Sequence, residues 1–120
     1  MNDRDLTILK KMIRYADEIE WTIEKMNLDF EMFESDFIAK NAIAMCILQI
    51  GELVGKLTEE TKKKYNKMPW KDIRSIRNIA AHNYGELDNE VLWETVTDDI
   101  PKLKAVSYTH LRAHETSAHL

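Results

Sequence analysis

Arg77, His82 and Tyr84 place a guanidinium, an imidazole and a phenol within eight consecutive residues. His82 is also the only histidine before residue 110. An arginine holds a phosphate through two parallel hydrogen bonds without losing its proton, and a histidine gives or takes a proton near neutral pH. This pair could cleave RNA without a metal ion, because the ribose 2′-hydroxyl is itself the nucleophile. His82 would then be the general acid or base, and Arg77 would hold the scissile phosphate.

The spacing of the pair raises a geometric problem. In one continuous helix over residues 70–84, Arg77 and Tyr84 share a face, whereas His82 points about 140° away from Arg77. Two arrangements would bring the pair together. The helix could loosen near His82, which Gly85 favours, or a second copy of the chain could complete the site across a two-fold axis.

The same residues are also compatible with purely structural roles. A histidine near the end of a helix often caps carbonyls and interacts with the helix dipole. Arg77 could pair with a carboxylate such as Glu52 or Asp88, and Tyr84 could be an ordinary core aromatic. Spacing alone does not separate this interpretation from the catalytic one.

Helical periodicity dominates the sequence and predicts an all-α fold. Apolar residues recur every three or four positions over residues 3–26, and a much more apolar helix is predicted over residues 36–60, capped by Ser35 or Asp36. A third helix begins after Pro69, and a fourth begins at Asn89, with Asp88 as its cap and Pro101 as a possible bend. Residues 62–68 allow one more short turn. No segment alternates with a period of two, so we expect an antiparallel bundle of four to five helices.

The predicted central helix carries a polar stripe. Asn41, Gln49 and Glu52 fall within a sector about 80° wide. Unpaired buried polar groups cost roughly 1–3 kcal/mol each, so these side chains need partners.

The composition is that of one globular domain. The chain has 120 residues, a net charge of −4 and a single cysteine, Cys46, which excludes a disulfide framework. No signal peptide is recognisable, and no apolar run is expected to span a membrane, so we expect a cytoplasmic protein without a membrane partner. No group of side chains before the last residues has metal-ligand spacing, so neither a metal nor a cofactor is expected.

The negative net charge conceals a basic stretch between residues 56 and 77. Eight basic side chains face three acidic ones there; the basic residues are Lys56, Lys62, Lys63, Lys64, Lys67, Lys71, Arg74 and Arg77. Affinity for phosphate depends on the local field, so Lys71 and Arg74, on the same predicted helix as Arg77, are expected to bind RNA. For residues 62–64, a solvated helix end is an equally plausible reading.

The last residues differ from the rest. Residues 106–120 have no useful apolar period and resemble translated adapter or vector sequence, so the domain is expected to comprise residues 1–105 and the tail to be non-native or disordered. His110 and His114 lie four apart and would share one helical face as a possible metal pair, but we exclude the tail from the functional argument.

A family resemblance emerges from the third predicted helix. Residues 68–84 read MPWKDIRSIRNIAAHNY, and they are followed by LD at 87–88 and VLW at 91–93; upstream, residues 49–52 read QIGE. Together these motifs resemble the HepT-like branch of the HEPN superfamily, over roughly residues 1–105.

The resemblance implies a homodimeric HEPN-like bundle that acts as an endoribonuclease toxin of a toxin–antitoxin pair, with its site at the dimer cleft. Arg77 and His82 match the catalytic pair, while Asn78 and Glu52 would support the site. Tyr84 matches the tyrosine that a partner nucleotidyltransferase of the MntA type adenylylates to silence the toxin. The alternative is a non-catalytic helical subunit that binds such a nucleotidyltransferase.

Overall fold

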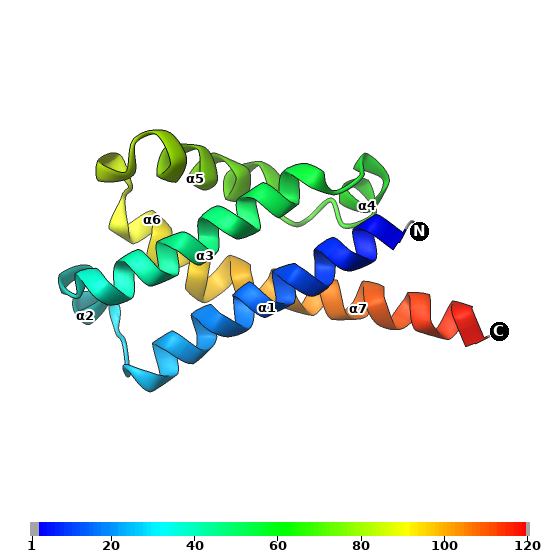
Figure 1. Cartoon of the computed structure of the whole chain (residues 1–120), viewed down its shortest axis with the longest axis horizontal. Helices are drawn as coiled ribbons and strands as arrows, with labels where there is room; N and C mark the ends of the chain where they lie inside the picture. Colours follow the sequence, from blue (N-terminus) through cyan, green and yellow to red (C-terminus); the bar gives the residue numbers. More distant parts are fainter. Residues whose placement is uncertain (1–2, 120) are drawn as a thin grey trace.

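The structure is a computed structural model that describes residues 3–119, with side-chain burial for residues 4–114 (Figure 1). Every regular element within residues 3–119 is helical, and no strand occurs there. The elements are α1 (Asp3–Lys25), α2 (Phe30–Ser35), α3 (Phe37–Lys56), α4 (Glu59–Lys64), α5 (Trp70–His82), the 3-10 turn η1 (Tyr84–Glu86), α6 (Asn89–Glu94), the π-helical segment η2 (Thr95–Asp99) and α7 (Ile100–His119). The predicted all-α class is confirmed.

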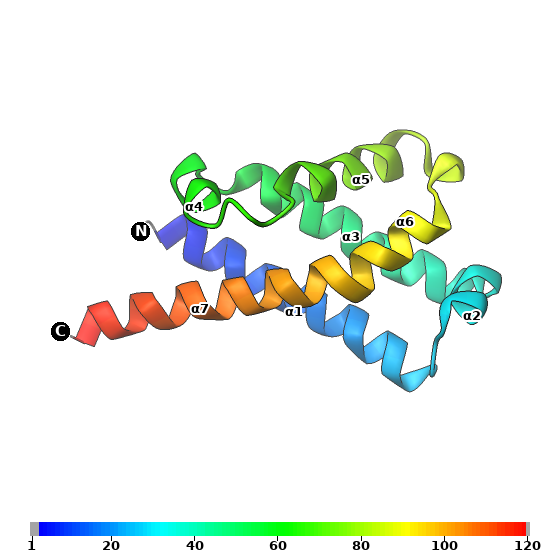
Figure 2. The same ribbon diagram turned by 180° about the vertical axis from the view of Figure 1, so that it is seen from behind.

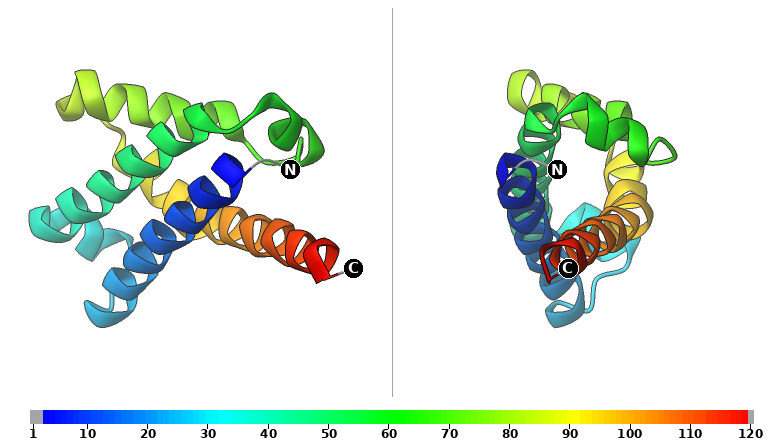
Figure 3. Two further views of the ribbon diagram at one scale, coloured as in Figure 1. Left: turned by 45° about the vertical axis from the view of Figure 1, so that its right-hand side comes forward. Right: turned by 90° about the vertical axis from the view of Figure 1, so that its right-hand side faces the viewer.

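The four long helices run in alternating directions around one interior, with α3 between α1 and α5 and with α7 against α1 (Figures 1 and 2). An end-on view shows them surrounding a single core (Figure 3). Each contributes fully buried side chains to it, among them Leu9, Ile47, Ile73 and Ile100. The apolar periodicity of the sequence therefore corresponds to one shared core.

The helix caps follow the expected chemistry. Asp36 begins α3 by accepting hydrogen bonds from the backbone N–H groups of Ile38 at 3.0 Å and Ala39 at 3.1 Å. Asp88 begins α6 in the same manner. Of the two caps proposed for the central helix, the structure uses Asp36.

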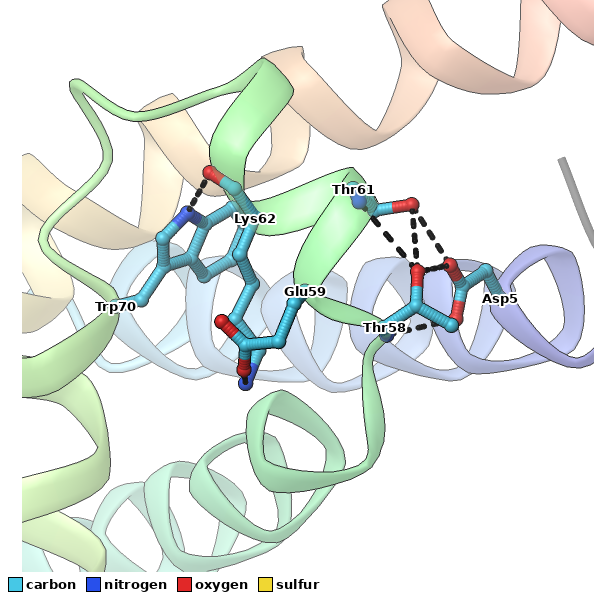
Figure 4. Close-up of polar contacts among 6 residues, drawn as sticks. All are labelled: Asp5, Thr58, Glu59, Thr61, Lys62 and Trp70. Carbon is cyan, nitrogen blue, oxygen red and sulfur yellow. Dashed lines mark hydrogen bonds and ion pairs between the residues drawn. The ribbon is translucent and has the colours of Figure 1, made fainter.

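The predicted helix over residues 36–60 is in fact two helices. The backbone of Leu57 is extended, and Thr58 caps a new helix, α4, through its hydroxyl. Asp5 at the start of α1 holds this junction: its carboxylate accepts hydrogen bonds from the Thr58 hydroxyl at 2.6 Å and the Thr61 hydroxyl at 2.7 Å (Figure 4). A local side-chain network thus ends the helix where periodicity alone would continue it.

One helix within the described residues, α3, is long and apolar enough to cross a membrane by length and composition alone. The expectation that no apolar run reaches this length was therefore wrong. The helix packs between α1 and α5, and eight of its residues are buried. Its apolar character is accounted for by its central place in the bundle.

The final helix continues past the predicted end of the domain. α7 runs without a break to His119; Ser107 and His110 are buried, and the Tyr65 hydroxyl lies 2.8 Å from Nδ1 of His110. His110 and His114 belong to no candidate metal-ligand group among the described residues. The boundary after residue 105 stays a prediction; Leu120 and the side chains of residues 115–119 lie outside the described part of the chain.

Candidate active site

Arg77 is seated where α5 comes closest to α3. A Cβ atom added at Gly51 of α3 would lie 2.2 Å from Cβ and 2.9 Å from Cγ of Arg77, distances that real side chains do not adopt. Only glycine therefore allows α5 to approach α3 at this point. The aliphatic stem of Arg77 is thus part of the helix–helix packing.

The guanidinium of Arg77 has partners on both sides. Its Nη2 donates to the carboxylate of Glu52, and its Nη1 donates to the side-chain oxygen of Asn78 at 3.1 Å. The Nε atom is buried without a hydrogen-bond partner, and the side chain is 21% exposed. The structure thus brings together three predicted site residues, Arg77, Glu52 and Asn78, and leaves the Asn78 side open to solvent.

His82 occupies the last position of α5 and is exposed. The α-helix runs unbroken from Arg77 to His82, so the two side chains still leave the helix about 140° apart. The helix does end near His82, because the chain departs from it at Asn83, but His82 itself keeps its helical position. One chain does not bring the predicted catalytic pair together.

Tyr84 lies in η1, and its side chain contacts α3, the helix that also carries Gly51 and Glu52. Its hydroxyl donates to the side-chain oxygen of Asn41 on α3. Asn41 and Glu52 are eleven residues apart, which places them only about 20° apart around α3. Two residues of the predicted polar stripe, Asn41 and Glu52, therefore have partners in Tyr84 and Arg77, whereas Gln49 donates to the sulfur of Met45 at 3.9 Å.

A shallow apolar groove separates these two polar contacts. It has a volume of about 320 Å³, and it is lined by Asn41, Ala44, Met45, Leu48, Ala80 and Tyr84. Met45 is 57% exposed, and Ile38, about two turns earlier along α3, is 65% exposed. Burial raises the pKa of the Tyr84 hydroxyl, although the residue remains 42% exposed. The groove and the exposed side chains of Met45 and Ile38 form one strip of apolar surface, which we call the apolar strip. It extends along α3 beside Tyr84 and the contact between Arg77 and Glu52.

A larger cavity of about 830 Å³ lies on the other side of α5, beside α4. The predicted RNA-binding residues Lys71 and Arg74 line it, and so do Lys62 and Lys63. Nη1 of Arg74 donates to the backbone oxygen of Gly51 at 3.0 Å. Sequence reasoning did not assign a role to Lys62 or Lys63 in a site, although the basic run that contains them was the available signal.

Gly55 lies against the guanidinium of Arg74, a looser contact than that of Gly51 with the stem of Arg77. A Cβ atom at Gly55 would lie 2.7 Å from Cζ of Arg74, at the end of a side chain that can rotate. Two glycines one turn apart on α3 therefore accommodate two arginines one turn apart on α5. Sequence reasoning missed this role, because the spacing of the glycines shows it only once the two helices are known to pack together.

Other reactive groups do not form a second centre. Within the part of the chain that the structure describes, no three His, Cys, Asp or Glu side chains are grouped as metal ligands. Burial, together with a smaller contribution from the nearby Glu18 carboxylate, raises the pKa of the Cys46 thiol to about 11. A thiol with such a pKa is a poor nucleophile at neutral pH.

Comparison with known proteins defines the class. The family model described as "Ribonuclease HepT-like" matches residues 12–109, most of the helical bundle and all of the site. The chain therefore belongs to the HepT-like ribonuclease family of the HEPN superfamily.

Individual relatives span most of the chain. "Putative RNase TTE0752" from Caldanaerobacter subterraneus subsp. tengcongensis is 34% identical over 88 residues, which cover 72% of this chain and 79% of the relative. "Putative RNase MJ1216" from Methanocaldococcus jannaschii is 31% identical over 106 residues, covering 87% and 85%. "Probable ribonuclease HepT" from Thermococcus cleftensis is 30% identical over 95 residues, covering 75% and 86%. No solved structure matches the chain significantly.

Proposed function

We propose that this protein is a metal-independent endoribonuclease toxin whose active site lies at a cleft between two copies of the chain. The observation that carries the proposal is the seat of Arg77 in a chain of a ribonuclease family: its stem is fixed against Gly51, and Glu52 and Asn78 orient its guanidinium. An oriented guanidinium binds two oxygens of one phosphate. Lys71 and Arg74, further along α5, would bind the RNA strand beside it.

The chemistry needs two proton transfers and no additional nucleophile. The 2′-hydroxyl oxygen attacks the adjacent phosphorus, the bond to the 5′-oxygen breaks, and a 2′,3′-cyclic phosphate and a 5′-hydroxyl remain. His82 removes the 2′-hydroxyl proton, and the imidazolium formed in this step then gives a proton to the leaving 5′-oxygen. Arg77 stabilises the charge that accumulates on the phosphorane oxygens.

A second copy of the chain would supply the His82 that one chain does not bring to its own Arg77. Arg77 and His82 diverge on α5, whereas a two-fold axis beside the apolar strip would place the His82 of one copy near the Arg77 of the other. Exposed Ile38 and Met45 give this strip apolar surface for a self-complementary contact. The proposed assembly is therefore a homodimer through α3 and the end of α5.

Cleavage of RNA by the purified protein, with a chelator present throughout, tests the proposal. We expect wild type to cut and the Arg77→Ala and His82→Ala variants to lose about 100-fold or more of the rate. Equal rates in all three proteins would reject the catalytic assignment. Wild-type cleavage that occurs only in a parallel assay without chelator would reject the metal-independent route.

Tyr84 is proposed as the site at which a partner nucleotidyltransferase of the MntA type silences the toxin. Its hydroxyl oxygen would attack the α-phosphorus of ATP, with loss of the hydroxyl proton and release of pyrophosphate. The attached AMP would place a charged, bulky group over the strip between Tyr84 and Arg77. Intact mass after incubation with that partner and ATP should rise by AMP increments in wild type and not in Tyr84→Phe; increments in the variant would reject the site.

One observation favours a second candidate function. Glu52 and Asn78 already engage both terminal nitrogens of Arg77, as in a purely structural ion pair. The alternative is a non-catalytic helical subunit that binds the nucleotidyltransferase without cutting RNA. Absence of cleavage in wild type, together with a stable complex with that partner, would support this alternative.

A further inference from the structure

We infer that the basic cavity between α4 and α5 binds the nucleotide of an RNA strand that adjoins the scissile phosphate. The inference rests on the proposed ribonuclease function and deepens it, because it defines a substrate subsite next to Arg77. The cavity, about 830 Å³ in volume, lies within the usual range for sites that bind small molecules.

Cations line two opposite walls of this cavity. Lys62 and Lys63 belong to α4, and Lys71 and Arg74 belong to α5. The acidic side chains on its border are Glu59 and Asp72, which are both exposed. Four cations against two carboxylates give a positive local field in a protein whose net charge is −4. Such a field favours a phosphodiester over a neutral ligand.

The wall formed by α4 is held in place without using the ammonium groups. The indole N–H of Trp70, at the start of α5, donates to the backbone oxygen of Lys62 at 3.2 Å (Figure 4). The same N–H also donates to the backbone oxygen of Tyr65 at 3.1 Å. At the other end of α4, Thr58 and Thr61 are bonded to Asp5. The two sets of bonds fix the helix, so its lysine side chains remain available for a ligand.

The ion pair between Lys62 and Glu59, at the border of the cavity, is weak. Nζ of Lys62 lies 3.3 Å from the Glu59 carboxylate, but the Glu59 side chain is 77% exposed. Exposed pairs of this kind contribute about 0–1 kcal/mol. A phosphate can therefore replace Glu59 as the partner of Lys62 at little cost.

Arg74 links the cavity to the residue that contacts Arg77. Arg74 bonds to the backbone oxygen of Gly51, the same residue that seats Arg77. At 1.5 Å per residue, Lys71 lies about 9 Å from Arg77 along α5. Val54, Met68 and Pro69 add apolar wall against which a ribose or base can pack. A strand held by Arg77 would therefore present its neighbouring nucleotide to the cavity.

The test measures binding of a fluorescent single-stranded RNA oligonucleotide by anisotropy over a range of salt concentrations. The protein carries His82→Ala, so that the RNA remains intact. The cavity variant adds Lys63→Gln and Lys71→Gln, and the matched control adds Lys10→Gln and Lys11→Gln, two adjacent exposed lysines of α1. Both variants remove two positive charges, and thermal melting verifies that both are folded.

We expect the cavity variant to bind RNA at least 10-fold more weakly than the control. We also expect the slope of log K against log salt to fall by about 1.4, because each lost phosphate contact on a single strand contributes about 0.7. Equal affinity and equal slope in the two variants would overturn the inference. Displacement of RNA by AMP at concentrations similar to the RNA Kd would also overturn it, because the ligand would then be a free nucleotide.

Failure of this inference is separable from failure of the proposed function. If wild type cleaves RNA and the cavity variant, with His82 restored, cleaves it at every substrate concentration as fast as wild type, the subsite is rejected and the ribonuclease stands. If wild type does not cleave RNA, but the cavity substitutions still abolish its binding, the subsite stands and the catalytic proposal is rejected.

Discussion

Arg77 and His82 lie five residues apart on one helix and have opposite environments. Arg77 is packed against Gly51, ion-paired with Glu52 and largely buried, whereas His82 ends α5 and is exposed. The fold of one chain thus fixes the group proposed to bind phosphate and presents the proposed proton-transfer group to solvent. This contrast is what a site divided between two copies would require, because each copy would contribute a fixed Arg77 to one site and an exposed His82 to the other.

The largest expected effect comes from mixing two inactive variants. If each site takes Arg77 from one copy and His82 from the other, a mixed dimer of Arg77→Ala and His82→Ala contains one intact site. Statistical exchange at equal concentrations should then restore about a quarter of the wild-type cleavage rate. A mixture that stays as inactive as its components would show that Arg77 and His82 act within one chain. The different environments of Arg77 and His82 would then not reflect a site divided between two copies.

The seat of Arg77 is tested next, by Gly51→Ala. The added Cβ would collide with the arginine stem, so we expect a loss of about 1–3 kcal/mol in the free energy of unfolding. A displacement of Arg77 on the scale of 1 Å should lower the cleavage rate by about 100-fold. Calorimetry and RNA cleavage well below the melting temperature measure the two effects.

Gly85→Ala is the matched control, because a Cβ atom there meets nothing within 4 Å. It should leave both stability and cleavage near wild type. If Gly51→Ala behaves like Gly85→Ala, the close approach of α3 and α5 does not position Arg77. The statement that packing fixes Arg77 would then be rejected.

A smaller effect is expected from Glu52→Gln, which keeps the shape of the side chain but removes its charge. The guanidinium of Arg77 would be less well oriented, and we expect cleavage to fall by about 10-fold. Because both partners are partly exposed, the free energy of unfolding should fall by no more than about 1 kcal/mol. Asp98→Asn, which removes an exposed pair with Lys102, is the control and should change neither quantity. Unchanged cleavage in Glu52→Gln would show that Asn78 and packing suffice to orient Arg77.

The smallest expected effect on Arg77 and His82 comes from replacing Asp5, because its hydrogen bonds with Thr58 and Thr61 lie at the start of α4, away from both residues. Burial alone would raise the pKa of Asp5, but the hydrogen bonds from Thr58 and Thr61 outweigh it and hold that pKa below its ordinary value of 3.8. A carboxylate with a lowered folded-state pKa stabilises the protein above its unfolded pKa, and this contribution is lost as the pH falls through the folded value.

Asp5→Asn should therefore lower the free energy of unfolding by about 2 kcal/mol at neutral pH, and the difference from wild type should shrink below about pH 4. Chemical denaturation across this pH range measures it. A difference that grows on acidification would reverse the sign of the Asp5 contribution. The loss in the free energy of unfolding measured for Asp5→Asn at neutral pH can be compared directly with the loss for Gly51→Ala, because both substitutions act on contacts of the same bundle.

Much of the fold could be predicted because it depends on local patterns. Apolar spacing located α1, α3 and α5, and Asp36 and Asp88 cap their helices as their side-chain chemistry suggests. The break at Leu57 could not be predicted in this way, because Asp5, which is distant in sequence, supplies the carboxylate that stabilises it. Periodicity predicts which face of a helix is buried, not which distant side chain completes a junction.

The site was predictable as a set of residue types, but not as an arrangement. The pairing of Arg77 with a carboxylate was foreseen as one alternative, and the structure selects Glu52. The seats of Arg77 and Arg74 on Gly51 and Gly55 depend on the distance between two helix axes, which a sequence pattern does not encode. The same limitation applies to Lys62 and Lys63, whose place on the cavity depends on how α4 packs beside α5, where Trp70 bonds to the backbone of Lys62.

The close contact at Gly51 also constrains the register of α5 on α3. A Cβ atom at position 51 would lie 2.2 Å from Cβ of Arg77, so a residue other than glycine placed opposite this arginine would collide with it. The contact at Gly55 involves only the guanidinium end of Arg74, which can rotate away, so it does not impose the same constraint. The position of Arg77 along α3 therefore depends on where the chain places this one glycine.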